Sequence, residues 1–193
     1  MQPRAEFVHW MFAAGFLGIG LLLLAEAVVG EDVWRKRVWR AYLWPGATFL
    51  SGLMLWPVMA LYTNSAIHML AHGIWAQSMM AAGAAELALV RGKIRSPYWR
   101  LTTAVAVLVS GAAFLVHEQN PWLFSRAAFL HHAIGWTLIV ASVIALARVP
   151  RRSTAAQAGF ALAYVVVAIF LFADRDTAPI FGHMSPKAGV PHR

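Results

Sequence analysis

The chain has 193 residues, of which 60% are hydrophobic and only 12% are charged, and its mean hydropathy is +0.61. A soluble domain carries about twice that share of charged residues, so this composition excludes an ordinary soluble protein. The absence of cysteine excludes disulfides, thiolate zinc sites, iron–sulfur clusters and cysteine nucleophiles. The net charge of +8 comes largely from basic residues between apolar runs, a pattern typical of membrane topology signals and not of a nucleic-acid surface.

Six apolar runs are each about as long as the hydrocarbon core of a bilayer requires. In chain order they predict membrane-spanning helices at about 6–29, 40–62, 66–90, 98–118, 127–148 and 155–174. The first run resembles a signal peptide, but little positive charge precedes it, so we expect a retained span. Pro45 and Pro57 lie in the second run and can kink it, because each removes a backbone donor. The predicted fold is all-α: one six-helix transmembrane domain over 1–176, followed by a short outer-face tail at 177–193.

The basic residues predict the orientation of this bundle. Eleven of the sixteen follow the first, third and fifth spans: Arg35, Lys36, Arg37, Arg40, Arg91, Lys93, Arg95, Arg100, Arg148, Arg151 and Arg152. The opposite side holds Arg4, Arg126, Arg175, Lys187 and Arg193. Because cytoplasmic loops carry the excess of Lys and Arg, both termini are predicted to lie outside, in a bacterial-type inner membrane.

Glu26 and Glu86 are acids within predicted spans, near the basic side. We expect them to reach the interface and meet loop arginines there, because long polar side chains snorkel towards water. A proton path is the alternative.

Histidines gather at the other side of the predicted bundle, the side poor in basic residues. His68 and His72 are four residues apart in the third span and therefore share one helix face. An ionisable side chain at membrane depth is costly and usually faces the bundle interior. A pair of buried histidines bonded to backbone carbonyls is the structural alternative to metal ligation.

Further histidines lie at neighbouring span ends. His117 and Glu118 end the fourth span, and His131 and His132 begin the fifth after a short connection, so these spans should be antiparallel neighbours. Adjacent helical residues point about 100° apart, so His131 and His132 cannot face one site equally, and the sequence leaves open which is the ligand. Glu118 can orient an imidazole, and His9 begins the first span at a similar depth.

Together these residues predict a metal site at the outer face. The predicted ligands are His68, His72, His117, His131 and His132, with Glu118 and His9 in support. Imidazole-rich sites without thiolates suit copper, zinc, iron or nickel, and Cu(II) has the highest affinity in that order. No nucleophile–base arrangement or phosphate loop is recognisable, so no catalytic residue is assigned.

The segment from Ser65 to His72 resembles the His-Met-x-x-His segment of the CtaG-type cytochrome oxidase assembly factors. The layout of several spans with outer-face histidines is similar to that of the CopD-type copper resistance membrane proteins. The resemblance rests on one short segment and the topology, and this chain is shorter than those families, with fewer spans. It implies a copper link for His68 and His72 only.

The predicted function is therefore copper handling, that is uptake, delivery or oxidase assembly. The expected partners are membrane lipids and either a periplasmic metallochaperone or a larger membrane complex, without nucleic acid. One alternative is a membrane b-type cytochrome with a single haem between two histidines of facing helices. A copper or iron oxidoreductase and a non-catalytic accessory subunit are the others.

Overall fold

The computed structural model describes residues 5–61, 66–116, 126–149 and 153–174, and every regular element in these ranges is a helix. The helices are α1 (Ala5–Val29), α2 (Glu31–Arg35), α3 (Val38–Ala41), α4 (Leu43–Leu61), α5 (Ala66–Val90), the 3₁₀ helix η1 (Pro97–Arg100), α6 (Leu101–Val116), α7 (Arg126–Ala147) and α8 (Thr154–Ala173). The six long helices correspond to the six predicted spans.

Local sequence explains several helix ends. α5 ends at Val90, and Gly92 follows two residues later with a φ of 66°, which glycine readily adopts. The amides of Gly92 and Lys93 donate to the carbonyls of Leu89 and Ala88, which is the Schellman arrangement. Ser153 caps the start of α8: its hydroxyl accepts a hydrogen bond from the amide of Ala156, as a capping serine does.

The second predicted span, expected as one run at 40–62, is broken near its start. α3 ends at Ala41, and α4 begins at Leu43 after a turn at Tyr42. Pro45 lies in the first turn of α4, where its missing amide costs no helical hydrogen bond. Pro57, by contrast, lies inside α4.

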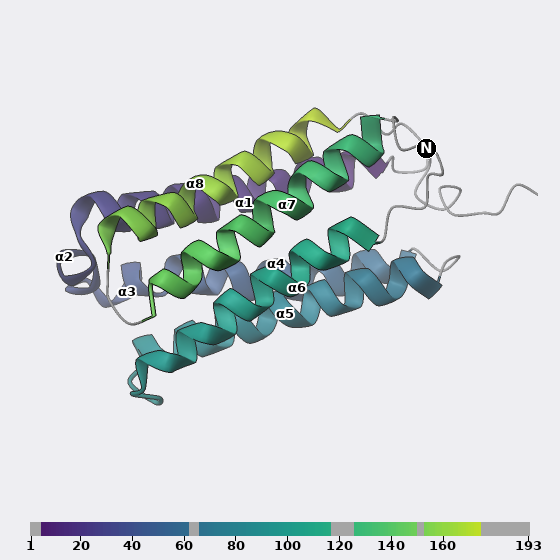
Figure 1. Cartoon of the computed structure of the whole chain (residues 1–193). Coiled ribbons are helices and arrows are strands. Elements are labelled where there is room, and N and C mark those ends of the chain that lie inside the picture. Colours follow the sequence, from purple (N-terminus) through teal and green to yellow (C-terminus); the bar gives the residue numbers. More distant parts are fainter. Residues whose placement is uncertain (1–4, 62–65, 117–125, 150–152, 175–193) are drawn as a thin grey trace, which may run out of the picture.

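The six long helices form a closed ring. Each long helix packs against the one that follows it in the chain, and α1 closes the ring by packing against α8. In Figure 1, α7, α8 and α1 form one layer that lies over a second layer of α4, α5 and α6. The interior is apolar and aromatic, and it includes Phe16, Trp75, Phe114, Phe160 and Tyr164.

Glycines allow close approach between neighbouring helices. A Cβ added to Gly83 of α5 would lie 2.6 Å from the backbone nitrogen of Phe49 in α4. A Cβ on Gly111 of α6 would lie 2.8 Å from the carbonyl oxygen of Gly135 in α7. Small residues at such crossings are typical of membrane helix pairs, where van der Waals packing drives association.

Among the described residues, five helical segments are long and apolar enough to cross a membrane: Glu6–Val29, Val38–Ala60, Pro97–Val116, Ala128–Ala147 and Thr154–Ala173. Large apolar side chains also lie on the outside of the ring, such as Val105, Val143 and Ile169, which are more than half exposed. α5 has 25 residues but is not among the five segments, so the described helices bear out five of the six predicted spans by length and composition.

Candidate functional site

Three histidines from three helices line one small cavity at one end of the ring. His9 comes from α1, His72 from α5 and His131 from α7. This histidine cavity has a volume of about 20 Å³, and its lining is Val8, His9, Phe12, Leu55, Val58, His72, Trp75, Phe114, His131 and Leu171. A site needs roughly 10–15 Å³ to hold one water molecule, so the cavity has room for a water molecule or a single ion.

Asp174 fixes one side of His9. Its Oδ2 lies 2.6 Å from Nδ1 of His9, and the two side chains are 5% and 20% exposed. The contact is close but not aligned as a hydrogen bond. Nδ1 is therefore the ring nitrogen of His9 that faces the carboxylate.

Aromatic rings hold the other two histidines. The ring of His131 lies 6.1 Å from that of His9 and 5.8 Å from that of Phe114, centroid to centroid. The ring of His72 lies 6.1 Å from that of Trp75. Trp75 in turn stacks on Phe16 at 5.8 Å, so the floor of the cavity is a packed aromatic cluster.

The structure separates His131 from His132, which the sequence left unresolved. His131 is buried and lines the cavity. His132 is not part of the lining, and its Nδ1 lies 2.8 Å from the carbonyl oxygen of Ala128, one turn earlier in the same helix.

The other predicted site residues are not placed by the structure. His117 and Glu118 lie outside the described residues, as does the side chain of His68. His9, expected only in support, lines the cavity directly. Asp174 was missed, although it follows the last apolar run at the same end of the bundle, and an acid at that depth was the available signal.

The chemistry that the cavity offers is imidazole nitrogen, with a carboxylate behind one ring. A carboxylate that contacts the second nitrogen of a histidine fixes its tautomer and raises its basicity as a ligand. Within the part of the chain that the structure describes, no three His, Cys, Asp or Glu side chains converge closely enough to hold a metal ion. Any ion bound there therefore requires some movement of these rings or additional ligands.

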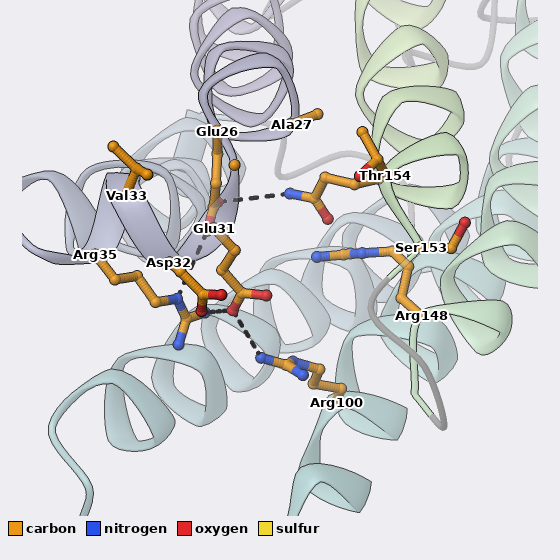
Figure 2. A pocket seen from close by; sticks show the side chains of 12 residues that line it. Glu26, Ala27, Glu31, Asp32, Val33, Arg35, Arg100, Arg148, Ser153 and Thr154 are labelled. Atoms are coloured by element: carbon orange, nitrogen blue, oxygen red, sulfur yellow. Dashed lines mark hydrogen bonds and ion pairs between the residues drawn. The ribbon is translucent and has the colours of Figure 1, made fainter.

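A larger cavity lies at the opposite end of the ring, where the basic residues cluster. This polar pocket, shown in Figure 2, has a volume of about 350 Å³, and its lining is Glu26, Ala27, Gly30, Glu31, Asp32, Val33, Arg35, Arg100, Arg148, Ser153, Thr154 and Gln157.

Ion pairs and hydrogen bonds connect the acids of this pocket to its walls. Glu31 lies 2.7 Å from Arg35 and 3.2 Å from Arg100. Glu26 is 3% exposed and lies 3.6 Å from Arg35. Its Oε2 accepts hydrogen bonds from Nε1 of Trp44 at 2.7 Å and from Nε2 of Gln157 at 3.5 Å.

The expected contact with an arginine is present for Glu26, whereas Glu86 forms no ion pair with a described arginine. Glu26 meets Arg35, a loop arginine. Glu86 is 1% exposed, and its Oε1 accepts a hydrogen bond from Thr103 at 3.2 Å. Its Oε2 has no hydrogen-bond partner among the described residues.

Arg148 lies just beyond the end of α7 and is 8% exposed. Burial lowers the pKa of its guanidinium from the ordinary value, and the negative charge of Glu86 opposes this shift. The guanidinium carbon lies 4.6 Å from the ring centre of Phe160 and 5.9 Å from that of Trp44, so aromatic faces replace part of its lost hydration.

Comparisons with protein-family models, with curated proteins and with solved structures find no match to this chain.

Proposed function

We propose that this chain is an integral membrane protein that binds a transition-metal ion, copper first, at the histidine cavity. The observation that carries the proposal is the contact between His9 and Asp174 on a cavity shared with His72 and His131. With Nδ1 of His9 turned to the carboxylate, Nε2 is the nitrogen that we propose as the ligand. That is the arrangement in which histidine serves as a metal ligand.

Copper fits the donors of this chain best. There is no cysteine, so soft thiolate ligands are absent, and imidazole is the principal donor. Among divalent first-row metals such donors bind Cu(II) most tightly. His68, His117 and Glu118 belong to the proposed ligand set because they are close in sequence to the described ends of α5 and α6.

The proposed topology has six spans with both termini outside, in an inner membrane. α5 completes the count because it has 25 residues and packs between α4 and α6 in the ring, and a helix needs about 20 residues to span the hydrocarbon core. The excess of basic residues at the opposite end supports a histidine cavity that faces the exterior. Its role would then be uptake, delivery or assembly, in exchange with an outer-face metallochaperone or a larger membrane complex.

A single haem between two histidines fits this cavity poorly. Pockets for ligands of drug size or larger have volumes of about 300–1,000 Å³, whereas the histidine cavity has about 20 Å³. Aromatic side chains fill the space beneath the imidazoles. The b-type cytochrome is therefore the weaker of the two redox-metal proposals.

Elemental analysis tests the proposal on the untagged protein, purified in detergent without chelator. About one copper per chain is expected for the wild type. His72→Ala and His131→Ala should lose most of it, while His132→Ala, the matched control next to His131, should retain it. Equal copper in all three variants would mean adventitious binding. Absence of metal from the wild type would favour an accessory subunit.

A further inference from the structure

The polar pocket has no role in the metal proposal. Two of its acids have close partners among the described residues, whereas one of its arginines does not. Glu31 has Arg35 and Arg100 as partners, and Glu26 has Arg35, Trp44 and Gln157. Figure 2 shows the links among Glu26, Glu31, Arg35 and Arg100 as dashed lines. No such line reaches Arg148.

Arg148 makes no hydrogen bond or ion pair with any described residue. It is 92% buried, since 8% of it is exposed, and its guanidinium points into the pocket in Figure 2. A buried charge is costly unless it is paired, and a guanidinium offers five N–H donors in a planar fork that matches phosphate and carboxylate oxygens. The rings of Phe160 and Trp44 lie 4.6 Å and 5.9 Å from the guanidinium carbon, and no hydrogen-bond acceptor from the described residues contacts its donors.

The start of α8 lies on the same wall. Ser153 and Thr154 line the pocket, and α8 continues for 20 residues. The capping hydroxyl of Ser153 satisfies only the amide of Ala156, so the amides of Thr154 and Ala155 lack a helical partner. Such amides, together with the positive end of the helix dipole, favour an anion.

We propose that the polar pocket binds an anionic group of the phosphate type, with Arg148 as its main partner and the start of α8 as its second. Arg100 lines the same pocket and uses one nitrogen on Glu31, so it adds positive charge. The volume of about 350 Å³ accommodates a small molecule or a head group. The phosphate can come from an anionic phospholipid or from a soluble phosphate compound.

A charge placed at the start of α8 tests this without disturbing the fold. Thr154→Asp introduces a carboxylate into the pocket, whereas Ser96→Asp introduces one on an exposed residue that is not part of the lining and precedes η1. Aspartate is favoured at the start of a helix, so both variants should fold. Arg148→Gln removes the proposed main partner, with Arg91→Gln as an exposed control of equal charge change.

Binding is measured on the full chain in nanodiscs, as the shift in thermal unfolding midpoint at constant ionic strength. One arm titrates inorganic phosphate in phosphatidylcholine discs, and the other increases the share of phosphatidylglycerol. We expect a saturable shift in at least one arm, which identifies the source of the phosphate. Thr154→Asp and Arg148→Gln should weaken it about tenfold or more, since charge-assisted hydrogen bonds are lost.

Ser96→Asp and Arg91→Gln should leave the apparent affinity unchanged. The proposal is overturned if neither arm gives a saturable shift, or if Thr154→Asp and Ser96→Asp respond equally. If Arg148→Gln does not fold, the comparison of the two aspartate variants decides the question alone.

Discussion

Asp174, the residue that follows α8, contacts the ring of His9 near the start of α1, with 2.6 Å between Oδ2 and Nδ1. The two residues come from opposite ends of the chain and meet because α1 packs along α8. The contact places the carboxylate at Nδ1 of His9, so a substitution at Asp174 tests whether it supports Nε2 as the proposed ligand.

Asp174→Asn should weaken metal binding about 10- to 100-fold, the usual effect of losing a carboxylate behind a histidine ligand. The variant keeps the shape of the side chain but removes its negative charge. Competition with a copper chelator of known affinity measures the change. Asp32→Asn, on an exposed residue at the other end of the bundle, serves as the control. Equal affinities in the two variants would show that Asp174 does not support a ligand.

Cysteine labelling tests the topology, because the chain has no cysteine of its own. Asn64 precedes α5 and Lys93 follows it. If α5 spans the membrane, Asn64→Cys should react with an impermeant maleimide added outside, and Lys93→Cys should react only after the membrane is permeabilised. Pro121→Cys and Pro150→Cys should repeat the two patterns. The reverse result would place the histidines in the cytoplasm, and labelling of both Asn64→Cys and Lys93→Cys from one side would remove α5 from the spans.

Gly83→Ala should destabilise the bundle by about 1–3 kcal/mol, the usual cost of overpacking. The new Cβ would lie 2.6 Å from the backbone nitrogen of Phe49 and 2.8 Å from its Cα, and backbone atoms cannot rotate away. Unfolding in mixed detergents, followed by circular dichroism, measures the loss. Gly18→Ala in α1 is the control, since nothing lies within 4 Å of its added Cβ; it should be neutral or stabilise by up to about 1 kcal/mol.

Trp44→Phe should also destabilise the protein, by about 1–3 kcal/mol, because it removes a donor to a buried carboxylate. Nε1 of Trp44 donates to Oε2 of Glu26 at 2.7 Å, and both residues are 3% exposed. Trp39→Phe is the matched control, since Trp39 is 59% exposed. The same unfolding assay applies, and a Trp39 variant as unstable as the Trp44 variant would argue against the hydrogen bond as the cause.

The positions of the long helices could be predicted from the sequence because each apolar run is long enough to span a bilayer. The break at Tyr42 was harder to predict, because it depends on a local turn ahead of Pro45 within an otherwise apolar run. α5 is long enough to span, but its polar residues, among them His72 and Glu86, weaken the apolar signal on which the prediction relied.

The candidate site could be predicted only in outline. The depth of each histidine follows from its position along a helix, so the sequence could predict that His72 and His131 lie at the same end of the bundle. The rotation of each helix about its axis depends on packing, which is why His131 lines the cavity and His132 does not. The sequence analysis counted Arg148 as a loop charge, but the ring faces of Phe160 and Trp44 cover it. This burial depends on the packing of α4, α8 and the end of α7, which the sequence alone does not show.

The closure of the ring by α1 and α8 also has a consequence for biosynthesis. Of the described helices, α1 leaves the ribosome before the others, and α8, one of its two ring neighbours, leaves after the others. Until α8 is inserted, one side of α1 faces lipid or the translocation machinery, and His9 lacks its contact with Asp174. The proposed metal site would therefore be complete only after α8 is in place, and a nascent chain that stalls before Thr154 would leave the bundle open along α1.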